Sequence, residues 1–299
     1  MDWNSALKGY KLFLRLEKAL SENSIVSYLN DINKLQQFID LSGSTTPPNQ
    51  ITTDQIRAML NWLNEIGISL NSQARLISGI KSFFNYLDIE NELTENPTHL
   101  IEAPRIGRKL PDTLSHEEVD QLIGAINLSS QEGHRNKAIL ETLYSCGLRV
   151  SELINLQISK LYFKDEFIVV IGKGDKERLV PISGVAIKNI NIYVDNYRNK
   201  LDIQKGHEDY VFLNRRGKQL TRVMIFTIIK QLVAQTGINK SISPHTFRHS
   251  FASELVNRGA DLRAVQEMLG HESITTTEIY THLDKNYLRE TILDYHPRS

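Results

Sequence analysis

The chain has 299 residues, which is long enough for two domains, since single hydrophobic cores stop growing near about 250 to 300 residues. Its 35 basic and 35 acidic residues balance, so the chain lacks the overall basic excess that many DNA-binding proteins carry. A single cysteine, Cys146, excludes an intramolecular disulfide and is predicted to be a small buried residue. No uninterrupted apolar stretch follows residues 1–5, which predicts a cytoplasmic protein without a signal peptide or membrane span.

The N-terminal third predicts a small helical domain, 1–104. Apolar residues keep helical spacing in four stretches, at 3–14, 25–38, 56–63 and 76–87. Ser21 or Ser24 is a candidate cap for the second stretch, and residues 45–49 (TTPPN) predict a loop. The apolar stripes are interpreted as the core of this domain.

Residues 105–112 predict an exposed linker. Prolines and a glycine cluster between two helical patterns here, and Arg105, Arg108 and Lys109 make the segment basic. Such a linker suits a path across a DNA backbone. A second domain, 113–299, follows it.

A hairpin is predicted in the middle of the second domain. Residues 167–171 (FIVVI) and 178–182 (RLVPI) have strand composition, and a glycine-bearing turn at 172–175 joins them. Lys173 lies at the tip, where it can reach a leaving oxygen that must be protonated. The spacing is not that of a P-loop.

A helix that begins with a polar cap and a proline is predicted near residue 244. Ser243 and Pro244 precede an apolar-periodic run that stops at Gly259, the usual punctuation of a helix. His245 and Arg248, three residues apart, therefore share a face at the helix start. Partial positive charge at that end favours a bound phosphate.

These side chains suit phosphoryl transfer from DNA without a metal. An attacked phosphodiester needs fixed cations, and arginine is the best side chain for this, which points to Arg149 and Arg248. Glu152, three residues after Arg149, can brace its guanidinium. Tyr280 offers a phenol that forms a covalent ester, and His245 can accept its proton.

A zinc site is the alternative for the histidines at 245 and 249, because their i, i+4 spacing is that of zinc peptidases. Thr246 stands where that motif has its general-base glutamate, and Arg248 would place a cation beside the metal. We therefore predict no metal here.

Five short motifs in fixed order resemble one known family. They are 147–153 (GLRVSEL), 172–174 (GKG), 245–249 (HTFRH), 269–271 (LGH) and 280–282 (YTH). The chain is similar to the tyrosine recombinases of the integrase family, and to their Xer type, whose interdomain stretch resembles residues 96–118. The last four residues, 296–299 (HPRS), resemble the D-type Xer proteins more than the C-type.

The resemblance implies a fold, mainly α with a small β-sheet: a SAM-like helical core-binding domain that clasps DNA, and an α+β catalytic domain. It implies that Tyr280 attacks the scissile phosphate and forms a 3′-phosphotyrosyl link, without metal or nucleotide cofactor. Lys173 is then the general acid, and His271 orients the phosphate and the phenol. Exchange of strands through a Holliday junction follows.

The resemblance also implies partners: a double-stranded DNA site like dif, a partner Xer recombinase in a heterotetramer with two copies of each, and a DNA translocase of the FtsK type as activator. Chromosome dimers would be the substrate. A mobile-element integrase or transposase, a type IB topoisomerase and a DNA-binding protein without catalysis remain alternatives.

Two further expectations concern surfaces. The apolar stripe after Tyr280 predicts a tail helix, which the resemblance implies docks into a neighbouring protomer; the alternative is that it folds back on its own domain. A basic face that offsets the zero net charge is predicted from Arg105, Arg108, Lys109, Lys173, Lys176, Arg178, Arg215, Arg216, Lys218 and Arg222.

Overall fold

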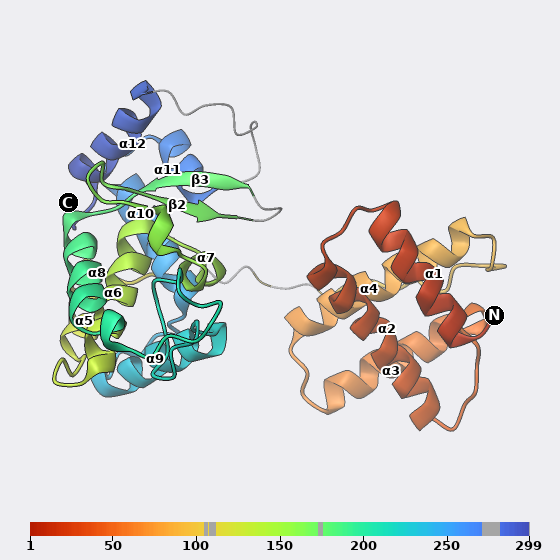
Figure 1. Ribbon diagram of the computed structural model, residues 1–299. Coiled ribbons are helices and arrows are strands. Elements are labelled where there is room, and N and C mark those ends of the chain that lie inside the picture. Colours follow the sequence, from red (N-terminus) through yellow and green to blue (C-terminus); the bar gives the residue numbers. More distant parts are fainter. Residues whose placement is uncertain (105–106, 108–111, 173–175, 271–281, 299) are drawn as a thin grey trace. The chain divides into compact units, whose positions relative to one another are not determined.

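The structure is a computed structural model that describes residues 1–104, 107, 112–172, 176–270 and 282–298. The chain folds as two compact units, Met1–Lys109 and Leu110–Ser299 (Figure 1). Helices dominate both units and the sheet is small, as the sequence predicts. Of the predicted linker, 105–112, only Gly107 and Asp112 lie within the described residues. None of the helices described is both long and apolar enough to cross a lipid bilayer.

Helices form at each stretch of the first unit where the apolar spacing predicts one: α1 (Trp3–Leu16), α2 (Glu22–Leu41), α3 (Thr53–Glu65) and α4 (Leu70–Ile89). Ser21, and not Ser24, caps α2, because its hydroxyl accepts a hydrogen bond from the backbone N–H of Ser24. The predicted loop at 45–49 runs into a short 3₁₀ turn, Pro48–Gln50. Tyr10, Phe83 and Phe84 are fully buried in the core between the helices.

The second unit surrounds a larger core with helices and one small sheet. Its helices in the described residues are α5 (His116–Gly124), α6 (Gln131–Cys146), α7 (Val150–Ile154), α8 (Gly184–Asn196), α9 (Arg222–Thr236), α10 (Pro244–Asn257), α11 (Leu262–Leu269) and α12 (His282–Tyr295), with 3₁₀ turns at Ile158–Lys160 and Arg198–Lys200. Helix α6 packs against α8 on one side and α10 on the other. Cys146, the last residue of α6, is fully buried, which confirms the prediction for it.

The predicted hairpin is present and is part of a three-stranded antiparallel sheet. Strands β2 (Phe167–Ile171) and β3 (Glu177–Pro181) pair so that Ile171 lies opposite Glu177. A two-residue strand, β1 (Leu161–Tyr162), extends the sheet beyond β2 and was not predicted, because two residues are too short to show a period. Helices α11 and α12 pack against β3 (Figure 1).

The tail helix α12 packs on its own domain. Leu288 and Ile292 are buried in a small core with Phe251 and Leu255 of α10. Just beyond the helix, His296 is buried and lies 3.2 Å through Nε2 from the carbonyl of Tyr144. The backbone N–H of residue 298 donates to His296 Nδ1, so the ring is neutral with its proton on Nε2, and burial lowers the pKa of His296 to about 3.

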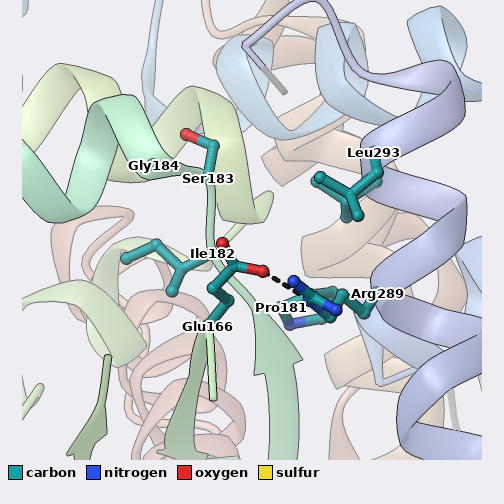
Figure 2. A pocket seen from close by; sticks show the side chains of 8 residues that line it. Glu166, Pro181, Ile182, Ser183, Gly184, Arg289 and Leu293 are labelled. Carbon is teal, nitrogen blue, oxygen red and sulfur yellow. Dashed lines mark hydrogen bonds and ion pairs between the residues drawn. The ribbon is translucent and has the colours of Figure 1, made fainter. Parts of the chain in front are cut away.

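The structure of the single chain therefore shows the alternative to the predicted docking of the tail into a neighbouring protomer. Figure 2 shows where α12 meets the end of the sheet: Arg289 pairs with Glu166, and Leu293 faces the segment at Ile182 and Ser183. The hollow between them measures about 20 Å³, room for one water molecule and not for a larger ligand. The hollow is therefore part of the packing interface between α12 and the sheet.

Gly147 ends helix α6 in a conformation that other residues rarely adopt. Its φ is +58°, and a Cβ at this position would lie 2.5 Å from Cδ1 of Phe251. Both constraints select glycine, the first through the left-handed backbone and the second through the close approach of α10. The turn brings Arg149 directly after the end of α6.

We expect Gly147→Ala to lower the free energy of unfolding by about 1–3 kcal/mol, because the added methyl group clashes and the backbone is strained. Urea denaturation followed by circular dichroism measures the change. Gly124→Ala is the matched control in the same unit, since nothing lies within 4 Å of a Cβ there, and it should stay within about 1 kcal/mol of wild type. Equal stability of the two variants would contradict the account of this turn.

Candidate active site

A buried carboxylate, that of Glu152, lies at the start of helix α7. Its side chain is only 2% exposed. It accepts hydrogen bonds from the backbone N–H of Arg149 at 2.7 Å and from Arg149 Nη1 at 2.9 Å. The same carboxylate therefore caps the helix and fixes the guanidinium of Arg149, which confirms the predicted bracing contact.

A second arginine, Arg178 of β3, binds the same carboxylate. Its Nη1 and Nη2 donate to the two oxygens of Glu152 at 2.7 and 2.9 Å, a bidentate pair. Arg178 is 8% exposed, so its assignment to a DNA-facing basic surface was wrong. The burial of Arg178 could have been predicted from the alternation of side chains along β3, which places Arg178 on the same buried face as Val180.

Burial raises the pKa of Glu152, but hydrogen bonds and charge from Arg178, followed by those from Arg149, outweigh it, so the pKa lies below its ordinary value. Glu152 is thus ionised at neutral pH. It supplies negative charge that lets two arginines lie close together inside the domain.

The third arginine of the site, Arg248, lies on the first turns of α10, as predicted. It is 8% exposed and donates through Nη1 to the carbonyl of Gly147 at 2.8 Å and through Nη2 to the carbonyl of Leu269 at 2.5 Å. Burial lowers the pKa of Arg248 to about 10, and the nearby charge of Arg149 acts in the same direction. It remains a cation at neutral pH.

Carbonyl groups at the C-terminal end of helix α11 accept hydrogen bonds from all three arginines. Those of Met268, Leu269 and Gly270 accept hydrogen bonds from Arg178, Arg248 and Arg149 respectively, at 3.0, 2.5 and 3.2 Å. Carbonyls at a helix C-terminus have no partner within the helix and carry partial negative charge, so cations suit them. Sequence reasoning missed this arrangement, because backbone carbonyls have no signature in the sequence.

His245 lies on the exposed start of α10, close to this group of cations. Partial desolvation of its ring lowers the pKa of His245 below the ordinary value of 6.5, and the charges of His249, Arg248 and Arg149 add to the effect. The imidazole is therefore mostly neutral at pH 7. A neutral imidazole can accept a proton, which is what the predicted role requires.

The structure brings together four of the predicted residues: Arg149, Glu152, His245 and Arg248. Of the two predicted catalytic arginines, Arg149 and Arg248, which we call the arginine pair, Arg149 is the accessible one, with 36% of its side chain exposed. The other three predicted catalytic residues, Lys173, His271 and Tyr280, lie outside the described residues.

Among the basic residues predicted to face DNA, those that the structure describes are exposed apart from Arg178; they are Lys176, Arg215, Arg216, Lys218 and Arg222. Over the same described stretches, no three acidic, histidine or cysteine side chains come together in a group suited to a metal ion.

Comparison with known proteins identifies the fold. The sequence model of the Phage integrase family matches residues 112–287, and that of the Phage integrase, N-terminal SAM-like domain matches residues 7–91. The chain is 42% identical over 294 residues to the Tyrosine recombinase XerD of Oceanobacillus iheyensis, covering 98% of this chain and 99% of that protein.

Solved structures agree with this relationship. The crystal structure of XerA recombinase is 30% identical with a TM-score of 0.50, over 99% of each chain. That of the XerH site-specific recombinase bound to a palindromic difH substrate, a post-cleavage complex, is 26% identical with a TM-score of 0.67, over 89% of this chain and 78% of that one.

The fold and the matched models define a tyrosine recombinase, an enzyme that breaks and rejoins DNA. The chain belongs to the phage integrase family, and the curated proteins that it resembles over nearly its whole length are of the Xer type. The predicted family and the predicted fold class, a SAM-like helical domain with a mainly helical integrase domain, are confirmed.

We expect Glu152→Gln to lower the free energy of unfolding by roughly 3–5 kcal/mol at pH 7, because the buried Arg178 and the partly exposed Arg149 both lose their counter-charge. The partners lower the pKa of Glu152 in the folded state, so its contribution is complete above the ordinary value of 4.5 and is lost as the pH falls through the folded value. The difference between variant and wild type, measured by urea denaturation, should therefore shrink between pH 7 and pH 3.5.

Glu177→Gln is the matched control for this measurement. Glu177 pairs with Lys160 at 2.9 Å, but its side chain is 47% exposed, and such pairs contribute about 0–1 kcal/mol. A loss for Glu152→Gln that is no larger than this, or that stays constant with pH, would contradict the role given to the carboxylate.

Proposed function

We propose that this recombinase cuts DNA through a 3′-phosphotyrosyl intermediate formed by Tyr280, and that Arg149 and Arg248 bind the phosphate under attack. The observation that carries the proposal is how the two cations are held: Glu152 binds Arg149, and carbonyls at the end of helix α11 bind both arginines. Such a group is fixed before the substrate arrives, so it needs no reorganisation as charge develops on the phosphate oxygens.

The hydrogen bonds of the two arginines support this role. A guanidinium has five N–H donors, and within the described residues each of the pair uses two nitrogens to bind the protein. Donors therefore remain for the non-bridging oxygens of a phosphate. Contacts through both terminal nitrogens of each guanidinium restrict its rotation, which preserves the geometry of a bidentate contact.

The remaining roles follow the family. His245 accepts a proton or donates a hydrogen bond, and its lowered pKa favours the neutral, accepting form at pH 7. Lys173 protonates the 5′-oxygen that leaves, and His271 orients the phosphate and the phenol of Tyr280. Attack by a 5′-hydroxyl of a second strand on the phosphotyrosine then releases the tyrosine and joins the strands, so no nucleotide or metal cofactor is needed.

The substrate that we propose is a dif-like site on chromosome dimers, which the enzyme resolves in the cytoplasm through a Holliday junction. The support is the similarity, at 38–42% identity over nearly the full length, to proteins named XerD. The further partners are a second Xer recombinase, two copies of each per tetramer, and an activating DNA translocase of the FtsK type. Docking of α12 into a neighbouring protomer is proposed for this assembly on the family resemblance alone, and it would require the helix to leave the contacts with its own domain that the single chain shows.

Three alternatives differ from this proposal in the reaction that they would carry out on DNA. A mobile-element integrase or transposase would recombine a different site by the same chemistry, whereas a DNA-binding protein without catalysis would form no covalent adduct. A type IB topoisomerase would relax supercoils without exchanging strands. Strand exchange between two dif-like sites therefore separates the proposal from all three.

Incubation with a nicked duplex that carries a Xer-type site should give a covalent protein–DNA band on a denaturing gel. The band should survive EDTA and should disappear in Tyr280→Phe, because the phenol oxygen forms the ester. Tyr287→Phe is the matched control, since Tyr287 lies on the tail helix and should leave the band unchanged. A band that persists in Tyr280→Phe, or that is absent from the wild type even with a partner recombinase, would contradict the proposal.

A further inference from the structure

We propose that Arg178 is a positioning residue for DNA cleavage, which holds Glu152 and the end of helix α11 in the arrangement that aims Arg149 at the phosphate. This inference rests on the function proposed above. It assigns a role in the reaction to a side chain that does not touch the substrate.

Arg178 is engaged by the protein on all three of its nitrogens. Nη1 and Nη2 bind Glu152, and Nε donates to the carbonyl of Met268 at 3.0 Å. Only 9% of its side chain is exposed. Because its donors point at the protein and little of it reaches solvent, its effect on the phosphate must pass through its partners.

The carboxylate that Arg178 binds is the one that orients Arg149. Oε1 of Glu152 accepts from the Nη1 atoms of both arginines, and Oε2 accepts from Arg178 Nη2 and from the backbone N–H of Arg149. Arg178 supplies two of these four bonds. Without it, Glu152 would be held only by Arg149, which is the more exposed partner, with 36% of its side chain in solvent against 9% for Arg178.

Arg178 also connects two parts of the chain on which catalytic residues are predicted. It belongs to β3, a few residues after Lys173 in the sequence, and its Nη1 lies 3.6 Å from a Cβ position at Gly172. Its bond to Met268 fixes the helix end whose next two carbonyls bind Arg248 and Arg149. At Gly270, a Cβ would lie 3.0 Å from Cδ of Arg178, so the two are packed closely.

The charges around Glu152 make the positioning role visible in the pH dependence of cleavage, which a role in packing alone would not change. The charged groups that act on this carboxylate are Arg149 beside α7, Arg178 on β3 and Arg248 on α10. Loss of Arg178 removes the strongest of these, so the pKa of Glu152 rises relative to wild type. A protonated Glu152 holds Arg149 less tightly, and cleavage should then fail at a higher pH than in wild type.

The test compares Arg178→Met, Arg178→Lys and a buried control arginine, Arg198→Met, in the full chain. Arg198 is 5% exposed and binds the carbonyls of Glu208 and Tyr210, so it matches Arg178 in burial and in backbone contacts. The measurements are the rate of covalent adduct formation on the nicked duplex at saturating protein, the affinity for the uncut site, and the pH dependence of the rate.

We expect Arg178→Met to slow adduct formation by about 100-fold, the effect of displacing a catalytic group by about 1 Å, with affinity within about threefold of wild type. Arg178→Lys, which keeps the charge but not the bidentate geometry, should lose about tenfold. Arg198→Met should cleave at the wild-type rate. The acidic limb of the pH–rate profile should move to higher pH in Arg178→Met.

The double variant Arg178→Met with Glu152→Gln separates positioning from general damage. Glutamine does not titrate, so the shift of the acidic limb should vanish, and the rate should be no lower than that of Arg178→Met alone because the two residues act as one unit. If wild type forms the adduct and Arg178→Lys cleaves equally fast, or if Arg198→Met is slowed as much as Arg178→Met, the inference is wrong while the proposed function stands. A wild type that forms no adduct overturns both.

Discussion

One buried carboxylate, shared by two arginines, determines the geometry of this site. Glu152 accepts four hydrogen bonds from Arg149 and Arg178, and its negative charge allows both cations to lie inside a domain where a single unpaired charge would be costly. The helix cap of α7, the position of β3 and the direction of Arg149 all depend on this group. A substitution at Glu152 should therefore change both the stability of the domain and the rate of the proposed cleavage.

The end of helix α11 supplies the second constraint. Three carbonyls in succession bind three arginines, so the partial negative charge of a helix C-terminus offsets cations that would otherwise repel one another. The lowered pKa of Arg248 reflects this repulsion after the effect of burial. In the function proposed here, a phosphate that binds to Arg149 and Arg248 would relieve this repulsion. The same fixed cations would then stabilise the additional negative charge that develops on the phosphate during attack.

Much of this arrangement could be predicted from the sequence. The helix that carries His245 and Arg248 was marked by Ser243 and Pro244, and the i, i+3 spacing of Arg149 and Glu152 predicted their contact. The role of Arg178 was not predicted, because a charged residue in a basic stretch resembles a surface residue. The carbonyls of α11 could not be predicted, since their partners come from distant segments and only folding brings them together.

The central claim is that the arginine pair acts on the charge of the attacked phosphate, and a substrate that lacks this charge tests it most directly. Adduct formation would be measured for wild type and Arg149→Ala on two nicked duplexes, one with the natural phosphate at the cleaved position and one with a neutral methylphosphonate. We predict that Arg149→Ala is slowed by about 10²–10³-fold on the phosphate but by less than about tenfold on the methylphosphonate, because a methyl group replaces one charged oxygen there and the transition state carries one negative charge fewer. An equal loss on both substrates would contradict the account.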